Sequence, residues 1–309
     1  MASFVSAQAD LTVAERIQQA KSDNATSLSL YETNITEIPL EVFALTQLDV
    51  LDLSGNNLAT LPVELATLAN LRELYLADNE LEIIPSVIFE LPNLERLDLS
   101  GNHITNIPDG IVSLSSLDIL NLGNNSLSEF PVEVLGVDSL RELTLTGNLL
   151  SIIPSDIGQF TRLETLYLGQ TGISELPSEI GMMTNLQGLF LDNNALTDLP
   201  NEISNLQNLR ELSLSNNHFE DIPPEIADLD ALRFLTIIGN PLSQVPSELN
   251  IFNPQALIEY ASTPSSFYLQ NLSLMLIFLS GGLLLLMNYL HWRRTQSTAY
   301  TKHELINRV

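Results

Sequence analysis

The chain has 309 residues, 45% of them hydrophobic, and contains no cysteine. This hydrophobic fraction excludes wholesale disorder, and the lack of cysteine excludes disulfides, thiolate metal sites and a cysteine nucleophile. With 38 acidic and 12 basic residues the formal net charge is -26, which argues against nucleic acid as a partner because a phosphate backbone is bound by a basic surface.

Residues 1–24 precede the regular part of the chain and are expected to cap it. The stretch 10–21 predicts an amphipathic helix, and Thr12 and Glu15 have the spacing of a capping box. The apolar residues expected to cover the first repeat are Leu11, Ala14 and Ile17.

Residues 25–254 repeat every 23 residues, ten times, without insertion or deletion. We number the positions of each repeat from 1, so that Ala25 and Leu48 are position 1 of the first two repeats. Positions 1, 4, 6, 11, 14, 18 and 21 are apolar in every repeat, and position 15 is always proline. Position 9 is asparagine in eight repeats; the exceptions are Thr33 and Thr171.

The apolar spacing within one repeat predicts two kinds of local structure. The alternation at positions 4 to 6 predicts a strand of three or four residues. The proline at position 15, usually followed two residues later by an acid, predicts one or two turns of helix, α or 3-10. One such unit cannot bury its leucines alone, so ten stacked units must share one core.

This pattern resembles the leucine-rich repeat family, and Leu48–Asn56, with the sequence LDVLDLSGN, is a close match to its motif. The resemblance covers 25–254. It implies an α/β solenoid, curved, with a parallel sheet on the concave side. It implies no particular ligand, because members of the family bind very different partners.

The asparagine at position 9 is expected to form a ladder of side-chain hydrogen bonds to the backbone of its own and adjoining turns. Threonine replaces only part of that bonding, so the repeat containing Thr171, residues 163–185, is expected to be a local weak point. The acids at position 17 lie near helix N-termini, where negative charge is stabilising.

Residues 255–271 are interpreted as a C-terminal cap and linker. The cysteine-paired caps of many secreted members of the family are absent. The side chains expected to cover the last repeat are Phe252, Leu257, Ile258 and Tyr260.

Residues 272–290 carry no charge and predict one transmembrane helix, because 19 residues rising 1.5 Å each span about 28 Å, close to the thickness of the bilayer core. The tail, 291–309, is short and basic, with Arg293 and Arg294 next to the apolar run. The positive-inside rule then puts the tail in the cytosol and the repeats in the extracellular or periplasmic space.

That orientation requires an export signal. Residues 1–9 are too short for the apolar core of one, although Ala7 and Ala9 resemble the end of a cleavage site and are interpreted as a remnant of a signal peptide. A true start upstream of Met1 is expected. The alternative is a protein anchored by its tail, with the repeats in the cytosol.

No catalytic, cofactor or metal site is predicted. The histidines His103 and His218 occupy the same position of repeats five apart, so strand spacing puts them about 24 Å from each other. The other two, His291 and His303, follow the predicted membrane helix, and the common nucleotide, protease and hydrolase motifs are missing.

Positions 2, 3, 5, 7 and 8 are expected on the concave face. In the first half of the array the arginines there have acidic neighbours in adjacent repeats, which predicts ion-pair ladders. In the second half two arginines are adjacent at position 2, aromatic residues occupy positions 3 and 5, and Gly188 leaves a gap. Arginine and aromatic residues anchor many interfaces, although an exposed aromatic can also be merely tolerated. The hypothesised partner site consists of Tyr167, Phe190, Arg210, Arg233 and Phe234.

The function expected from the sequence is that of a non-enzymatic, single-pass membrane protein that binds a protein, peptide or glycan on its concave face, similar to receptor-like proteins without a kinase. A tail of under twenty residues is too short for a folded domain, so signalling would require a recruited partner, laterally in the membrane or through the tail. Two alternatives stay open: a tail-anchored signalling scaffold facing the cytosol, and a surface adhesin or structural spacer.

Overall fold

The computed structural model describes residues 11–243, 245 and 254–262. The chain divides into two compact units, Met1–Ala261 and Ser262–Val309. Every helix and strand described below belongs to the first unit.

The predicted membrane helix 272–290 and tail 291–309 lie outside the described residues, as do 1–9 and Phe252. Within the part of the chain that the structure describes, no helix is long and apolar enough to cross a membrane.

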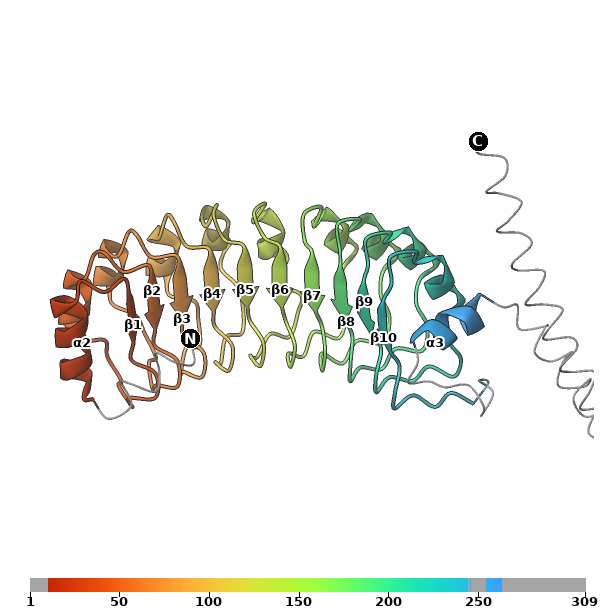
Figure 1. Cartoon of the computed structure of the whole chain (residues 1–309), viewed down its shortest axis with the longest axis horizontal. Coiled ribbons are helices and arrows are strands. Elements are labelled where there is room, and N and C mark those ends of the chain that lie inside the picture. Colours follow the sequence, from red (N-terminus) through yellow and green to blue (C-terminus); the bar gives the residue numbers. More distant parts are fainter. Residues whose placement is uncertain (1–10, 244, 246–253, 263–309) are drawn as a thin grey trace, which may run out of the picture. The chain divides into compact units, whose positions relative to one another are not determined.

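Each repeat contributes one three-residue strand at positions 3 to 5, and the ten strands form a single parallel sheet in chain order (Figure 1). Neighbouring strands pair with a constant offset of one repeat, so that Leu51 lies opposite Leu28 and Leu74. The strands are β1 (Ser27–Ser29), β2 (Val50–Asp52), β3 (Glu73–Tyr75), β4 (Arg96–Asp98), β5 (Ile119–Asn121), β6 (Glu142–Thr144), β7 (Thr165–Tyr167), β8 (Gly188–Phe190), β9 (Glu211–Ser213) and β10 (Phe234–Thr236).

The helical segment of each of the first nine repeats is a five-residue 3-10 helix at positions 16 to 20, preceded by the repeated proline. These helices follow the outer edge of the arc that the coils describe (Figure 1). They are η1 (Leu40–Ala44), η2 (Val63–Thr67), η3 (Ser86–Glu90), η4 (Asp109–Ser113), η5 (Val132–Gly136), η6 (Ser155–Gln159), η7 (Ser178–Met182), η8 (Asn201–Asn205) and η9 (Pro224–Asp228).

The apolar positions form one continuous core between the sheet and the 3-10 helices. The leucine at position 4, in the middle of each strand, is at most 3% exposed in all ten repeats, from Leu28 to Leu235. Because consecutive strand residues point to opposite faces, the residues at positions 3 and 5 point away from this core. They form the surface that we call the sheet face, which corresponds to the concave face expected from the sequence.

Asparagine at position 9 forms the predicted ladder. Asn79 donates from Nδ2 to the carbonyl oxygens of Leu53 in the preceding repeat and Leu76 in its own repeat, both at 3.1 Å. Its Oδ1 accepts from the backbone N–H of Leu58, again in the preceding repeat, at 3.0 Å. Each asparagine therefore joins two coils through buried hydrogen bonds.

Thr171 makes only part of these bonds, as predicted. Its hydroxyl donates to the carbonyl of Leu168 in its own repeat (2.8 Å), and it contacts Asn194 Oδ1 of the following repeat (3.0 Å). Among the described residues it makes no side-chain bond to the preceding repeat. There Ser151 has a left-handed backbone (φ 57°), so the irregularity lies between repeats 140–162 and 163–185.

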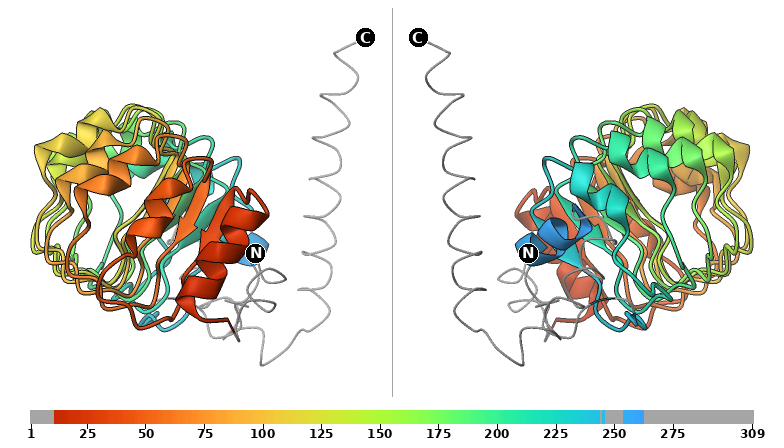
Figure 2. Two further views of the ribbon diagram at one scale, coloured as in Figure 1. Left: turned by 90° about the vertical axis from the view of Figure 1, so that its left-hand side faces the viewer. Right: turned by 90° about the vertical axis from the view of Figure 1, so that its right-hand side faces the viewer.

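Helices cap both ends of the array (Figure 2). Helix α2 (Val13–Ser22) has the predicted capping box and packs against β1, and α3 (Pro254–Ala261) packs against η9 and β10 and buries Leu257 and Tyr260. The prediction for the buried face of α2 was partly wrong: Ala14 is exposed and Leu11 half-buried. The residues of α2 that are buried are Arg16, Ile17 and Ala20.

Arg16 explains why the buried face of α2 is rotated from the one predicted. Its guanidinium donates to the carbonyl oxygens of Leu11 (3.2 Å) and Ser29 (3.3 Å), and it is 8% exposed. The side chain ties the start of the helix to the end of the first strand, which turns the Arg16 side of the helix toward the array.

Candidate functional site on the sheet face

A row of charged side chains crosses the sheet face at position 2. Arg72 pairs with Glu95 (2.9 Å), and Arg141 pairs with both Asp118 (3.2 Å) and Glu164 (3.0 Å). These are the ion pairs expected between adjacent repeats. All of these side chains are at least one-third exposed, so each pair contributes little to stability.

The ladder ends with Gln187, whose side-chain amide donates to Glu164 (2.9 Å). The next two members of the row are Arg210 and Arg233, both exposed. Within the described ranges neither has a carboxylate within ion-pair distance. Their guanidinium groups are therefore available to a ligand, whereas that of Arg141 is already occupied.

Aromatic side chains lie beside this end of the row. The rings of Tyr167 on β7 and Phe190 on β8 are stacked, with centroids 4.5 Å apart and planes at 11°. The gap expected above Gly188 is not open: Gly188 is buried, and a Cβ atom there would lie 3.0 Å from Cε2 of Phe190. The missing side chain thus makes room for the Phe190 ring.

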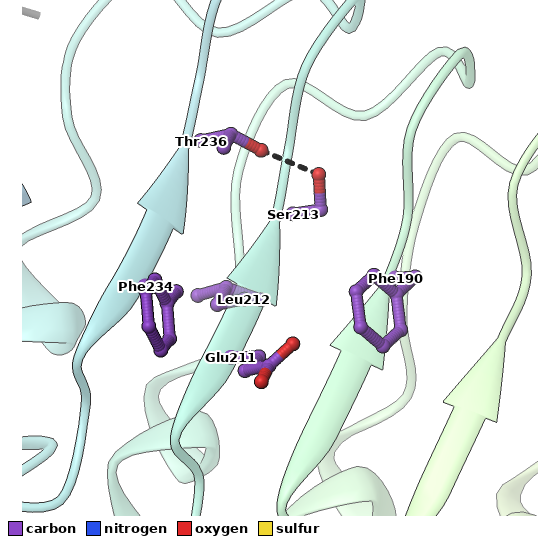
Figure 3. A pocket seen from close by; sticks show the side chains of 6 residues that line it. All are labelled: Phe190, Glu211, Leu212, Ser213, Phe234 and Thr236. Carbon is purple, nitrogen blue, oxygen red and sulfur yellow. Dashed lines mark hydrogen bonds between the residues drawn. The ribbon is translucent and has the colours of Figure 1, made fainter. Parts of the chain in front are cut away.

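A hollow of about 250 Å³ opens on the other side of Phe190 (Figure 3). It extends across β8, β9 and β10, with Phe190 at one side, Phe234 at the other and Glu211 between them. Phe234 is 61% exposed. The residues that line the hollow are Phe190, Glu211, Leu212, Ser213, Phe234 and Thr236.

One end of the hollow is polar. The hydroxyls of Ser213 and Thr236 are hydrogen-bonded to each other (Figure 3). The Ser213 hydroxyl also donates a hydrogen bond to Asp192 Oδ1. The same oxygen accepts a hydrogen bond from the backbone N–H of Ser215, with N and Oδ1 3.2 Å apart. These bonds fix the rotamers at the polar end, so the hollow has a defined shape there.

Two carboxylates act on the hydroxyl of the stacked tyrosine. Burial raises the pKa of the Tyr167 hydroxyl, and the carboxylates of Glu142 and Glu211 raise it further. The Glu73 carboxylate accepts a hydrogen bond from Tyr75, whereas the Glu211 carboxylate is exposed and has no hydrogen-bond or ion-pair partner among the residues described. An unneutralised carboxylate therefore stands between two phenylalanines.

Of the five residues hypothesised from the sequence, Phe190 and Phe234 line the hollow and Tyr167 stacks on Phe190. Arg210 and Arg233 immediately precede β9 and β10 and are not among the lining residues. Sequence reasoning missed Glu211, Ser213 and Thr236. Their repeat positions, 3 and 5, did place them beside the aromatic residues, and that register was the signal available.

The described part of the chain holds no group of three or more histidine, aspartate or glutamate side chains that could bind a metal ion. His103 instead contacts Glu80, with Nε2 and Oε2 3.0 Å apart.

A stack of equal coils, joined by a ladder of asparagines and presenting one variable sheet face, defines a solenoid repeat protein. Family models agree. Residues 23–81 and 91–150 match the model described as leucine rich repeat, 69–109 match the two-copy form, and 138–240 match a leucine-rich repeat region. The chain belongs to the leucine-rich repeat family. Among curated proteins no match was found.

Solved structures of the same fold come from bacteria and plants. A leucine-rich-repeat protein of Leptospira interrogans is 39% identical over 73% of this chain, with a TM-score of 0.67. The ectodomain of the Arabidopsis thaliana receptor kinase GASSHO1/SCHENGEN3, solved with CASPARIAN STRIP INTEGRITY FACTOR 2, is 36% identical over 66% (TM-score 0.58). The Arabidopsis receptor kinase HAESA, solved with the peptide hormone IDA and the co-receptor SERK1, is 29% identical over 71% (TM-score 0.60).

This chain spans only part of each of these proteins: 57% of the Leptospira protein, 26% of the GASSHO1/SCHENGEN3 ectodomain and 39% of HAESA. The likeness therefore concerns the repeat array.

Proposed function

We propose that the protein is a non-enzymatic recognition protein that binds a polypeptide partner on the C-terminal half of its sheet face. The observation that supports this most strongly is the hollow between Phe190 and Phe234, beside two arginines that have no acidic partner among the described residues. Aromatic and arginine side chains in one place are the usual energetic centre of a protein interface. HAESA was solved with the peptide hormone IDA, and the GASSHO1/SCHENGEN3 ectodomain with CASPARIAN STRIP INTEGRITY FACTOR 2, which agrees with this proposal.

The core of the array is already complete without Phe234. Its side chain is 61% exposed, whereas Leu212 and Leu235, which point to the core side of the sheet on β9 and β10, are buried. An aromatic ring held in water gains nothing for folding, because the hydrophobic effect rewards only the area removed from solvent. A partner that covers this ring would supply the missing burial.

We further propose that the repeats stand outside the cell or in the periplasm and are attached to the bilayer through 272–290. This rests on the uncharged run and on the arginines that follow it. Signalling, in that case, depends on a lateral membrane partner or on one recruited by the tail. Added protease that leaves the repeats intact in right-side-out cells would contradict this orientation.

A peptide-display selection tests the binding function directly. A random peptide library is panned on the immobilised full-length chain, and the affinities of enriched peptides are measured for the wild type and for Phe234→Ala. We expect at least a ten-fold loss of affinity, with an unchanged melting temperature because the side chain is exposed.

The matched control is Tyr75→Ala, which removes an aromatic side chain from the same face in the N-terminal half, on β3. We expect this variant to bind the selected peptides as the wild type does. Equal binding by the wild type and the Phe234→Ala variant would refute the proposed site.

A further inference from the structure

We infer that the hollow between Phe190 and Phe234 takes a cationic side chain, lysine or arginine, of the partner polypeptide, with the charged group held over Glu211 between the two rings. This inference rests on the proposed function and specifies the chemistry that the site selects. It was not foreseen from the sequence, which pointed to the arginines.

Three side chains that line the hollow follow one another across the sheet. Phe190, Glu211 and Phe234 come from three consecutive strands, and Glu211 lies between the rings (Figure 3). Strands about 4.8 Å apart put β8 and β10 roughly 10 Å from each other. A cation is attracted to an aromatic face within about 6 Å of its centroid, so one charged group above β9 can reach both rings.

Glu211 supplies an acidic group to the hollow. Its carboxylate is exposed and, within the described part of the chain, has no ion pair. Arg210 precedes it in the chain, and Arg233 immediately precedes β10, yet neither forms an ion pair with it. A cationic group in the hollow therefore gains a carboxylate that no base of the described residues pairs with.

The hollow is small, and the ring of Phe190 at its side is supported by Tyr167. About 250 Å³ is below the roughly 300–1,000 Å³ of small-molecule sites, so the hollow suits one side chain rather than a whole metabolite. Tyr167 covers the far face of Phe190 by stacking, which holds the ring in place before any ligand binds. The near face of the ring is left for the stem of a long side chain.

The net charge of the whole chain also favours a cationic partner. With a formal net charge of -26, the protein attracts basic partners and repels acidic ones at long range. Arg210 and Arg233 lie beside the hollow, whereas the acidic group among the residues that line it is Glu211.

The test uses three five-residue probe peptides that differ only in the central residue: lysine, norleucine or glutamate, between glycines with both termini blocked. Norleucine keeps the unbranched apolar stem and lacks the charge. Dissociation constants are measured by NMR titration of the full-length chain. We expect lysine to bind about ten-fold more tightly than norleucine, and glutamate to bind most weakly.

Two variants and one control assign the preference to the hollow. Glu211→Gln removes the charge and keeps the shape, and Phe234→Leu removes the ring and keeps an apolar side chain. Both should reduce the preference for lysine over norleucine at least five-fold. Glu142→Gln, which changes the same repeat position on β6 outside the hollow, should leave the preference unchanged.

Equal binding of the lysine and norleucine probes by the wild type would overturn the inference, as would a preference for glutamate or no measurable binding of the lysine probe. Failure of the proposed function is a different result: it appears when selected peptides bind the Phe234→Ala variant as tightly as the wild type. A lysine preference that survives in Glu211→Gln would also overturn the inference, because the charge would then be supplied elsewhere.

Discussion

The ring of Phe190 rests over Gly188 of the same strand and stacks against Tyr167 of the neighbouring strand, with the ring centroids 4.5 Å apart. The structure thus links an aromatic residue with the glycine two residues earlier, a relationship that the sequence alone does not show. The glycine admits the ring, and the tyrosine supports it.

Gly188→Ala tests this relationship. A Cβ atom would lie 3.0 Å from Cε2 of Phe190 and 3.2 Å from Cγ2 of Thr165, so the ring must shift. We expect the free energy of unfolding to change by less than about 1 kcal/mol, because alanine also lowers the entropy of the unfolded chain. Affinity for selected peptides should fall several-fold. Unchanged affinity in calorimetric titration would show that the position of the ring does not matter.

Thr171→Asn is expected to complete the ladder between repeats 140–162 and 163–185. The new side chain can donate to the carbonyl of Leu145, which Thr171 does not reach, and so add about 1 kcal/mol to the free energy of unfolding. Urea denaturation monitored by circular dichroism measures the change.

The control for Thr171→Asn is the opposite exchange, Asn148→Thr. This asparagine is fully buried and bonds to the carbonyls of Leu122 and Leu145. Its loss should cost about 1–3 kcal/mol because a buried acceptor is left unpaired. Equal stability of both variants and the wild type would mean that the ladder is not a source of stability.

Substitutions of the paired Arg141 and of Arg233 should have different effects on stability and on peptide binding. Arg141→Met breaks exposed ion pairs with Asp118 and Glu164, for which we expect a loss below about 1 kcal/mol and no effect on peptide binding. Arg233→Met breaks no ion pair among the residues described, and we expect unchanged stability but weaker binding. A larger binding defect from Arg141→Met would move the site to the middle of the array.

Glu225 gives the chain a pH-dependent contribution to stability. Its Oε2 is buried without a hydrogen-bond partner among the described residues, and burial, followed by Asp198 and Asp228, raises its pKa. A raised pKa means that the folded state holds this proton more tightly. Stability from this group is therefore present at low pH and is lost as the pH rises through the raised pKa.

Glu225→Gln should accordingly be more stable than the wild type at neutral pH, and the difference should shrink as the pH falls below the ordinary pKa of glutamate. Thermal denaturation at a series of pH values measures both. Asp109→Asn, at an exposed acid on η4, is the control. A Glu225→Gln variant that loses stability at neutral pH would show that the charged form is the stabilised one.

The fold was predictable from the sequence because repetition fixes it. Seven apolar positions in every repeat specify which side chains enter the core, and the leucines at position 4 are buried as expected. The irregularity at Thr171 was predictable for the same reason, since hydrogen-bonding capacity follows from residue type.

The details of the site were less predictable because they depend on rotamers and on contacts between repeats. The sequence showed that Gly188 lacks a side chain but not that the Phe190 ring would occupy the space. Glu211 was overlooked because an acid on an acidic protein is unremarkable by composition. Its position between Phe190 and Phe234, with no base paired to it in the part of the chain that the structure describes, makes it distinctive.

Site-specific photo-crosslinking tests the central claim most directly. Benzoylphenylalanine is introduced in the full-length chain in place of Phe234 or, separately, Tyr75 on the N-terminal half of the sheet face or Leu40 on η1, which is 66% exposed. After irradiation with a selected peptide, we predict a covalent adduct from position 234 and none from positions 75 and 40. Adducts from position 40 or 75, with none from 234, would contradict the account.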